Sequence, residues 1–88
     1  METKHYFYVL ECNDTTLYAG YTNDLEKRIK NHNDKKGAKY TKYRTPVKLV
    51  FAQTFETKSD ALKQEYAFKQ LTRKQKLAYI EERQSIND

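Results

Sequence analysis

Two short runs rich in aromatic, aliphatic and β-branched residues stand near the start of the chain, at positions 5–12 and 17–22. The segment between them, Asn13-Asp14-Thr15-Thr16, consists of residues that favour turns. This pattern predicts an antiparallel hairpin. Successive side chains of a strand point to opposite faces, so Tyr8 and Tyr18 are expected on one face, near each other. The same alternation puts Tyr6 and Leu10 with Tyr8, Gly20 with Tyr18, and Phe7 and Val9 on the other face.

The next element is predicted to be a helix. In Asn23-Asp24-Leu25-Glu26 a capping residue is followed three places later by Glu, the arrangement in which each side chain bonds a free backbone N–H of the first turn. The helical period then gathers four residues on one side: Leu25, Arg28, Ile29 and His32. Arg28 should therefore be held next to packed surface.

A loop and a third strand follow. Residues 34–46 contain the second glycine and the only proline and show neither strand nor helix periodicity, which predicts a loop long enough to be functional. Residues 47–55 alternate well and predict a strand with one buried side. That side is expected to carry Val47, Leu49, Phe51 and Phe55.

Two helices complete the predicted order. Thr57 or Ser59 can cap the first of them, and its apolar side is expected to hold Ala61, Leu62, Tyr66 and Phe68, with Glu65 beside the core. Thr72-Arg73-Lys74-Gln75 is a second capping box, and it predicts a short helix with Leu77 and Ile80 inward, residues 81–83 outward and residues 84–88 frayed.

The element order is therefore β-β-α-β-α-α. It predicts an α/β (α+β) fold with a small three-stranded, mainly antiparallel sheet flanked by helices. With 88 residues and a hydrophobic fraction of 38%, we expect a single domain over residues 1–88, with its core in about 5–80. No apolar run has the ~20 residues that cross a bilayer, so we expect a cytoplasmic protein without a membrane partner. Its oligomeric state stays open.

The charge is unevenly distributed. The chain has 17 Lys and Arg against 12 Asp and Glu, and residues 27–48 hold nine of the basic residues against Asp34 alone, a local charge of +8. Such a zone suits the phosphate backbone of a nucleic acid, although a solvated lysine-rich loop has the same composition. Cys12 is the only cysteine and there are two histidines, so a bound metal would need oxygen ligands.

Several of these segments together resemble one family. Tyr6-Phe7-Tyr8, then Tyr18-Ala19-Gly20, then Asn23 to Arg28 with His32 one turn later, is similar to the GIY-YIG nuclease superfamily. The similarity continues through residues 37–41 and 59–65, and it is closest to the small stand-alone bacterial members (UPF0213-like), most of which are uncharacterised.

The resemblance implies a metal-dependent endonuclease acting on DNA. It implies that Glu65 binds Mg²⁺ or Mn²⁺, that Arg28 stabilises phosphoryl charge, and that Tyr8 or Tyr18 activates or positions water. A tyrosine is a poor base at neutral pH unless a cation lowers its pKa, which Arg28 and the metal could do. His32, counted with the catalytic residues, is implied to be a second-line contact to the substrate or to the tyrosines, and Gly20 to let the backbone turn closely beneath the site. The expected nucleic-acid contacts are Lys35, Lys36, Lys39, Tyr40, Lys42 and Arg44.

Each assignment has an alternative. Glu65 could simply pair with Lys69 four residues on, and Arg28 with Asp24. The whole chain could be a non-catalytic nucleic-acid-binding module whose tyrosines stack on bases, or a small protein-interaction domain. Metal dependence distinguishes the nuclease from both.

Overall fold

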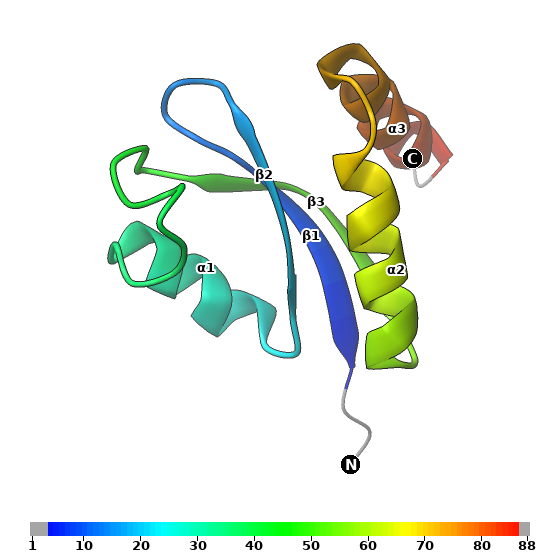
Figure 1. Ribbon diagram of the computed structural model, residues 1–88, viewed down its shortest axis with the longest axis horizontal. Coiled ribbons are helices and arrows are strands. Elements are labelled where there is room, and N and C mark those ends of the chain that lie inside the picture. The colour runs from blue at the N-terminus through cyan, green and yellow to red at the C-terminus, as the bar shows by residue number, and fades with distance from the viewer. Residues whose placement is uncertain (1–3, 87–88) are drawn as a thin grey trace.

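The sheet has three antiparallel strands in the order β2-β1-β3 (Figure 1). The computed structural model describes residues 4–86. Its strands are β1 (His5–Glu11), β2 (Leu17–Thr22) and β3 (Lys48–Phe55). The first two form the predicted hairpin, with Tyr8 opposite Gly20 and Leu10 opposite Tyr18. Because β1 is central, β2 and β3 are both edge strands.

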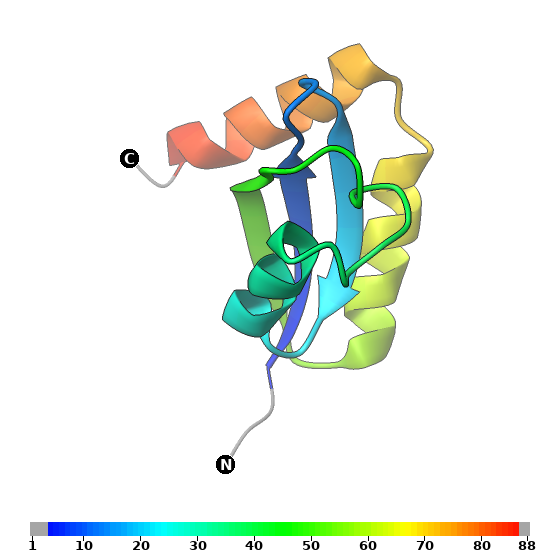
Figure 2. The same cartoon turned by 90° about the vertical axis from the view of Figure 1, so that its left-hand side faces the viewer.

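Helices cover both faces of this sheet (Figures 1 and 2). They are α1 (Leu25–Asn33), α2 (Lys58–Lys69) and α3 (Arg73–Ile86), so the predicted order β-β-α-β-α-α and the α+β class are confirmed. On the α1 face Tyr8, Leu10, Cys12 and Val47 are buried, and Tyr18, Leu25 and Ile29 pack against them. On the opposite face Phe7, Val9, Phe51, Phe68 and Ile80 form the larger core. Successive residues of β1 thus belong alternately to two separate hydrophobic clusters, one on each face of the sheet.

The helix caps agree with the predicted starts, with changes in detail. The side chain that caps α1 is Asp24, which accepts from the Lys27 N–H at 3.2 Å, so Glu26 falls one position short of the box partner. Thr57, not Ser59, caps α2. Thr72 and Gln75 bond each other's backbone N–H groups at 2.9 and 3.2 Å, which confirms the capping box before α3.

The predicted buried side of β3 is wrong, because the strand contains a β-bulge. Phe51 pairs with Val9, but Leu49 pairs with Leu10, so one extra residue of β3 stands between two successive pairs. The extra residue reverses the alternation, and Val47 therefore packs on the α1 face while Phe51 and Phe55 pack on the α2 face. Leu49 remains 40% exposed.

The helix faces differ from the predicted ones at four positions. Ala61, Phe68 and Ile80 are buried, but Leu62, Tyr66 and Leu77 are exposed, because α2 and α3 touch the sheet along narrower stripes than their apolar residues would cover. Arg83 is half-buried, with its guanidinium 3.5 Å from the centre of the Tyr79 ring. Helix α3 also continues through residues 84–86, where fraying was predicted. Residues 87–88 lie outside the described part.

Within residues 4–86, none of the helices combines the length and the apolar character that a membrane span requires.

Candidate functional site

The ring of Tyr8 lies directly over Gly20 in the neighbouring edge strand. A Cβ atom placed on Gly20 would lie 2.5 Å from the Tyr8 hydroxyl and 2.6 Å from Cζ. No side chain fits in that space, so Gly20 is needed here for its lack of a Cβ. With its ring on Gly20, fully buried Tyr8 carries its hydroxyl over β2 toward α1. The close approach that the resemblance implied for Gly20 is present.

Two residues of α1 hold this hydroxyl. Arg28 donates its Nε–H to the Tyr8 oxygen at 3.2 Å, and His32 Nε2 lies 2.9 Å from the same oxygen. Arg28 and His32 are four residues apart, so both project from the same side of the helix. The predicted helix side is confirmed, and it brings a cation, an imidazole and a phenol together.

The proton positions follow from the next partner of His32. Thr41 donates its hydroxyl proton to the Ala38 carbonyl at 3.1 Å, so its oxygen accepts the Nδ1–H of His32 at 2.8 Å. A neutral imidazole with a proton on Nδ1 has a free lone pair on Nε2. Tyr8 therefore donates its hydroxyl proton to His32 Nε2.

Burial sets the protonation states of this network. His32 is completely buried, and its burial and the nearby Arg28 charge lower its pKa to about 4. Burial also raises the pKa of Tyr8, against the opposing hydrogen bond and charge of Arg28. Arg28 by itself lowers the pKa of Tyr8, but desolvation outweighs it. At neutral pH His32 and Tyr8 are both uncharged. A joint effect of Arg28 and a metal on the pKa of a tyrosine stays a prediction.

Arg28 is the charged member of the site. Its hydrogen bond to Tyr8 is the largest influence that raises its pKa. Asp24, its suggested partner, caps α1 instead, and no carboxylate lies within ion-pair distance of Arg28 among the side chains that the structure describes. Half-buried Arg28 therefore carries a positive charge that no carboxylate of residues 4–86 balances at ion-pair distance.

Tyr18 lies beside this network and is more accessible than Tyr8. Its ring meets His32 edge-on, with centroids 5.2 Å apart, and stacks on Tyr40 at 5.9 Å. Its hydroxyl is near enough to Arg28 to raise the pKa of that guanidinium. Tyr18 is half-buried, whereas Tyr8 is fully covered. Both tyrosines thus lie near the Arg28 guanidinium, but Tyr8 is fully buried and Tyr18 is partly exposed.

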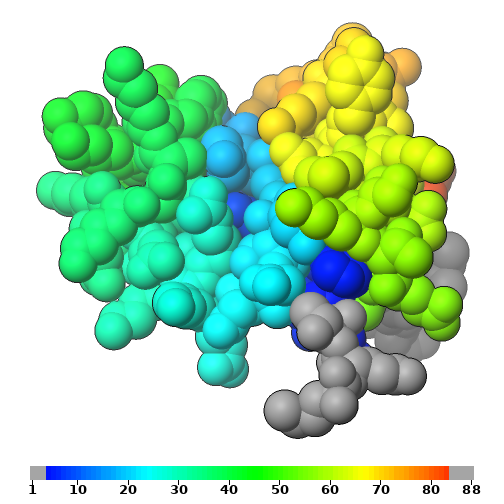
Figure 3. All heavy atoms as spheres, turned by 60° about the horizontal axis from the view of Figure 1, so that its bottom comes forward, coloured from blue at the N-terminus to red at the C-terminus, as the bar shows by residue number. Residues whose placement is uncertain are grey.

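Glu65 lies on α2, the helix that packs on the face of the sheet opposite α1. Its negative charge contributes to raising the Tyr8 pKa, which places it in the same electrostatic neighbourhood. Its side chain is 17% exposed, and Oε2 lies 2.7 Å from Lys69 Nζ. The suggested Glu65–Lys69 pair is therefore present in the free protein. Figure 3 shows the chain around β2, in cyan, between α1 with its loop and α2.

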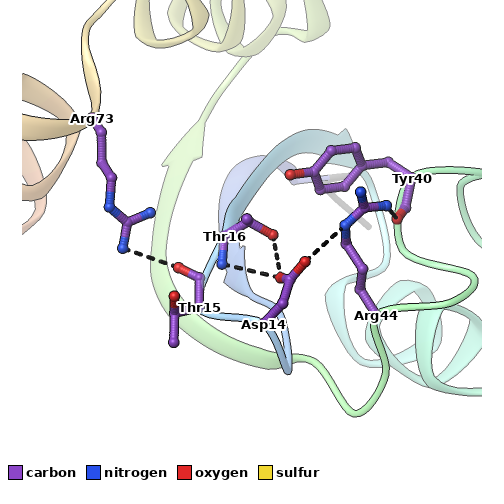
Figure 4. A network of polar contacts seen from close by, with 6 residues as sticks. All are labelled: Asp14, Thr15, Thr16, Tyr40, Arg44 and Arg73. Carbon is purple, nitrogen blue, oxygen red and sulfur yellow. Dashed lines mark hydrogen bonds and ion pairs between the residues drawn. The ribbon is translucent and has the colours of Figure 1, made fainter.

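The loop after α1 is tied to the site and to the hairpin. Gly37 lies so close to His32 that an added Cβ would be 2.7 Å from Cγ of the ring. Arg44 donates to Asp14 at 3.0 Å and to the Tyr40 carbonyl at 2.6 Å, and its guanidinium stacks 4.1 Å from the Tyr40 ring centre (Figure 4). From the other side, Arg73 donates to the Thr15 carbonyl at 3.0 Å.

The predicted nucleic-acid contacts therefore divide into two groups. Arg44 and Tyr40 are engaged within the protein, as just described. The lysines Lys35, Lys36, Lys39 and Lys42 are exposed. The contacts of all six residues with nucleic acid stay a prediction.

Sequence reasoning missed three participants: Thr41, Gly37 and Asp14. The first two lie inside the segment 37–41 that carried part of the family resemblance, so a signal for them was present. The role of Asp14 depends on Arg44, which is distant in sequence, and no local pattern indicates it.

The fold is that of a nuclease-type domain, because a model of the GIY-YIG catalytic domain matches residues 4–78. The chain therefore belongs to the GIY-YIG family. Within it, the chain is 62% identical to the UPF0213 protein YazA of Bacillus subtilis, over all of this chain and 90% of that one. It is 54% identical to a UPF0213 protein of Staphylococcus epidermidis, over 90% and 96% of the two chains. The predicted similarity to the small UPF0213 members is thus confirmed.

Two solved structures have the same fold. The solution structure of the UPF0213 protein BH0048 from Bacillus halodurans aligns with a TM-score of 0.60 at 45% identity, over 89% of this chain and 83% of that one. The solution structure of EF2693 from E. faecalis aligns with a TM-score of 0.63 at 49% identity, over 92% and 88%.

Proposed function

We propose that this protein is a divalent-metal-dependent endonuclease that hydrolyses phosphodiester bonds of DNA. The observation that carries the proposal is Arg28: a half-buried cation, unbalanced by any carboxylate in ion-pair distance among the described side chains, and fixed by a buried tyrosine. Such a group is typical of anion-binding sites. Membership of the GIY-YIG family supports the nuclease interpretation.

Arg28 would stabilise the transferred phosphoryl group. Charge builds up on the phosphoryl oxygens during hydrolysis, and a guanidinium that is already oriented stabilises that charge without reorganising. Tyr8 and His32 are positioning residues in this account. Both are fully buried, and their hydrogen bonds fix where the Arg28 guanidinium lies.

Tyr18 would orient the attacking water. It is the more accessible tyrosine, and its hydroxyl lies next to Arg28. The water oxygen adds to phosphorus, one P–O ester bond breaks, and the products are a phosphate monoester and a hydroxyl. The exposed lysines after α1 would contact phosphates on either side of the cleaved bond.

The residues fit a magnesium ion whose ligands come partly from the protein and partly from the substrate. Among the described residues no three acidic, histidine or cysteine side chains cluster as a closed metal site. One carboxylate suffices for Mg²⁺ or Mn²⁺ when phosphate oxygens and waters complete the coordination, and Glu65 is a carboxylate whose charge acts on Tyr8. When bound, the ion would neutralise charge on the leaving oxygen. Glu65 would have to release Lys69 to hold it.

The competing function is a non-catalytic nucleic-acid-binding module, and the Glu65–Lys69 ion pair at 2.7 Å favours it. In that case Glu65 serves only to pair with Lys69 on the surface of α2. The two functions differ in what happens when either member of the pair is changed.

The test is DNA cleavage in Mg²⁺ or Mn²⁺ by the wild type, Arg28→Ala, Glu65→Gln and Lys69→Met, with an EDTA control. We expect cleavage by the wild type, at least ~100-fold slower cleavage by Arg28→Ala and Glu65→Gln, and activity in Lys69→Met at or above wild type. Lys69→Met is the matched control, because it breaks the same ion pair and keeps the carboxylate.

If Lys69→Met loses as much activity as Glu65→Gln, the carboxylate acts through the ion pair and the metal assignment is wrong. Binding of DNA without cleavage under any of these conditions would support the binding module.

A further inference from the structure

Tyr43 is the most exposed large apolar side chain of the described residues, at 82%. Its ring contacts Lys42, whose Nζ lies 5.5 Å from the ring centre. The other aromatic residue of the same loop, Tyr40, is occupied by Tyr18 and by the Arg44 guanidinium. Tyr43 therefore presents an aromatic surface that contributes little to the fold.

The backbone that carries Tyr43 is fixed on both sides. Thr41 bonds His32 and the Ala38 carbonyl. Arg44 bonds Asp14 and the Tyr40 carbonyl through its side chain (Figure 4). Its own carbonyl accepts from the Asn13 N–H at 2.8 Å. The Arg44 N–H also donates to the Thr41 carbonyl at 3.0 Å. Tyr43 is thus exposed on a turn that hydrogen bonds hold in place on both sides.

This turn is next to the candidate site. Two peptide units separate Tyr43 from Thr41, so their Cα atoms are no more than about 7.5 Å apart. Thr41 in turn contacts His32, which holds the Tyr8 hydroxyl. The loop that presents Tyr43 and Lys42 is thus joined through Thr41 and His32 to the network that holds Arg28, so nucleotides that flank a phosphate at Arg28 would pass beside this loop.

We propose that Tyr43 is a base-stacking residue that selects DNA with unpaired nucleotides beside the bound phosphate. The inference rests on the proposed function and names its substrate class. The face of a base is open to a protein side chain when the base is unstacked, whereas paired bases in a duplex cover each other's faces. A tyrosine next to a lysine gives such a base a stacking surface and its phosphate a cation.

The test separates binding from cleavage. Single-stranded DNA carrying one 2-aminopurine, and the fully paired duplex of the same sequence, are titrated with the whole protein in EDTA, so that no strand is cut. The variants are Tyr43→Ala and Tyr43→Phe. Tyr66→Ala is the matched control, since Tyr66 is also highly exposed, at 69%, but lies on α2.

We expect the wild type to bind the single strand more tightly than the duplex and to quench the fluorescence of 2-aminopurine. Stacking on one aromatic ring is worth ~1–3 kcal/mol, so Tyr43→Ala should weaken single-strand binding by about 5- to 150-fold and abolish the quenching. Tyr43→Phe should retain both. Duplex affinity should change less than about twofold in Tyr43→Ala.

An equal loss on both DNAs, no loss on either, or the same loss in Tyr66→Ala would overturn the inference. If metal-dependent cleavage and the preference for single strands are unchanged in Tyr43→Ala, the proposed function holds and this substrate class is wrong. If the protein stacks on bases but does not cleave DNA when metal is added, the proposed function is wrong and Tyr43 is still a base-binding residue.

Discussion

The Tyr8 hydroxyl and His32 Nε2 lie 2.9 Å apart, both fully buried, and the proton between them belongs to the tyrosine. The direction follows from Thr41, which uses its own proton on the Ala38 carbonyl and so accepts from His32 Nδ1. Arg28 donates to the same phenol oxygen at 3.2 Å. One tyrosine thus joins the hairpin to α1 and to the following loop.

Replacing Gly20 with Ala should displace the Tyr8 ring, because the new Cβ would lie 2.5 Å from its hydroxyl. Overpacking of this kind costs about 1–3 kcal/mol in the free energy of unfolding, and the displaced hydroxyl should lose Arg28 and His32. Chemical denaturation and DNA cleavage measure the two effects. Ala52→Ser is the control, since Ala52 is exposed beside Tyr8 in the other neighbouring strand. Unchanged stability in Gly20→Ala would contradict the close approach.

In Thr41→Val the proton of His32 should no longer be confined to Nδ1. Valine has nearly the shape of threonine but cannot accept the Nδ1 proton, and an unpaired buried donor costs about 1–3 kcal/mol. The ¹⁵N shifts of the imidazole should show a proton on Nδ1 in the wild type and a mixture in the variant. Thr22→Val is the control, because buried Thr22 bonds Asp24 and does not touch His32. A wild-type spectrum with the proton on Nε2 would refute the assigned direction.

The stability of the protein should fall in mild acid. The pKa of His32 is lowered to about 4 in the folded state by burial and by Arg28, whereas an unfolded histidine has a pKa near ~6.5. The unfolded chain therefore binds more protons between these values, so the contribution of His32 is complete above pH ~6.5 and is lost as the pH falls toward 4.

Linkage between these two pKa values gives a loss of about 2 kcal/mol from pH 7 to pH 5. Urea unfolding at both pH values measures it, and His32→Gln should lose correspondingly less. Because that variant removes a partner of Tyr8, the imidazole proton resonances of the wild type provide a second measurement. A His32 midpoint above pH 6 would show that Tyr8, Thr41, Tyr18 and Arg28 do not surround it as described.

The Asp14–Arg44 ion pair should fix the loop more than it stabilises the fold. The pair is partly exposed, so a double-mutant cycle with Asp14→Ala and Arg44→Met should give only the small coupling typical of exposed ion pairs. Hydrogen exchange of the amides in residues 38–44 should nevertheless become faster in either variant. Breaking the exposed Lys48–Glu11 pair is the control and should leave these amides unchanged. Equal effects from both pairs would rule out a specific anchor at Asp14.

The hairpin, the helix starts and the face shared by Tyr8 and Tyr18 were predictable because each depends on neighbours in sequence. Alternation in β1 sets the faces, and Asp24, Thr57 and Thr72 cap helices through bonds to residues three positions away. The buried side of β3 was not predictable in this way. The bulge between Val47 and Phe51 is defined by the partner strand, which local periodicity does not contain.

The order of elements and the common side of Arg28 and His32 on α1 follow from local sequence, because helical spacing relates residues three and four positions apart. The protonation and burial of those residues depend on contacts between distant segments. Burial of His32 against Thr41, the passage of Tyr8 over Gly20 and the tie of Arg44 to Asp14 each join residues at least nine positions apart. Desolvation raises the pKa of Tyr8 in spite of Arg28, and it arises only when those segments pack together.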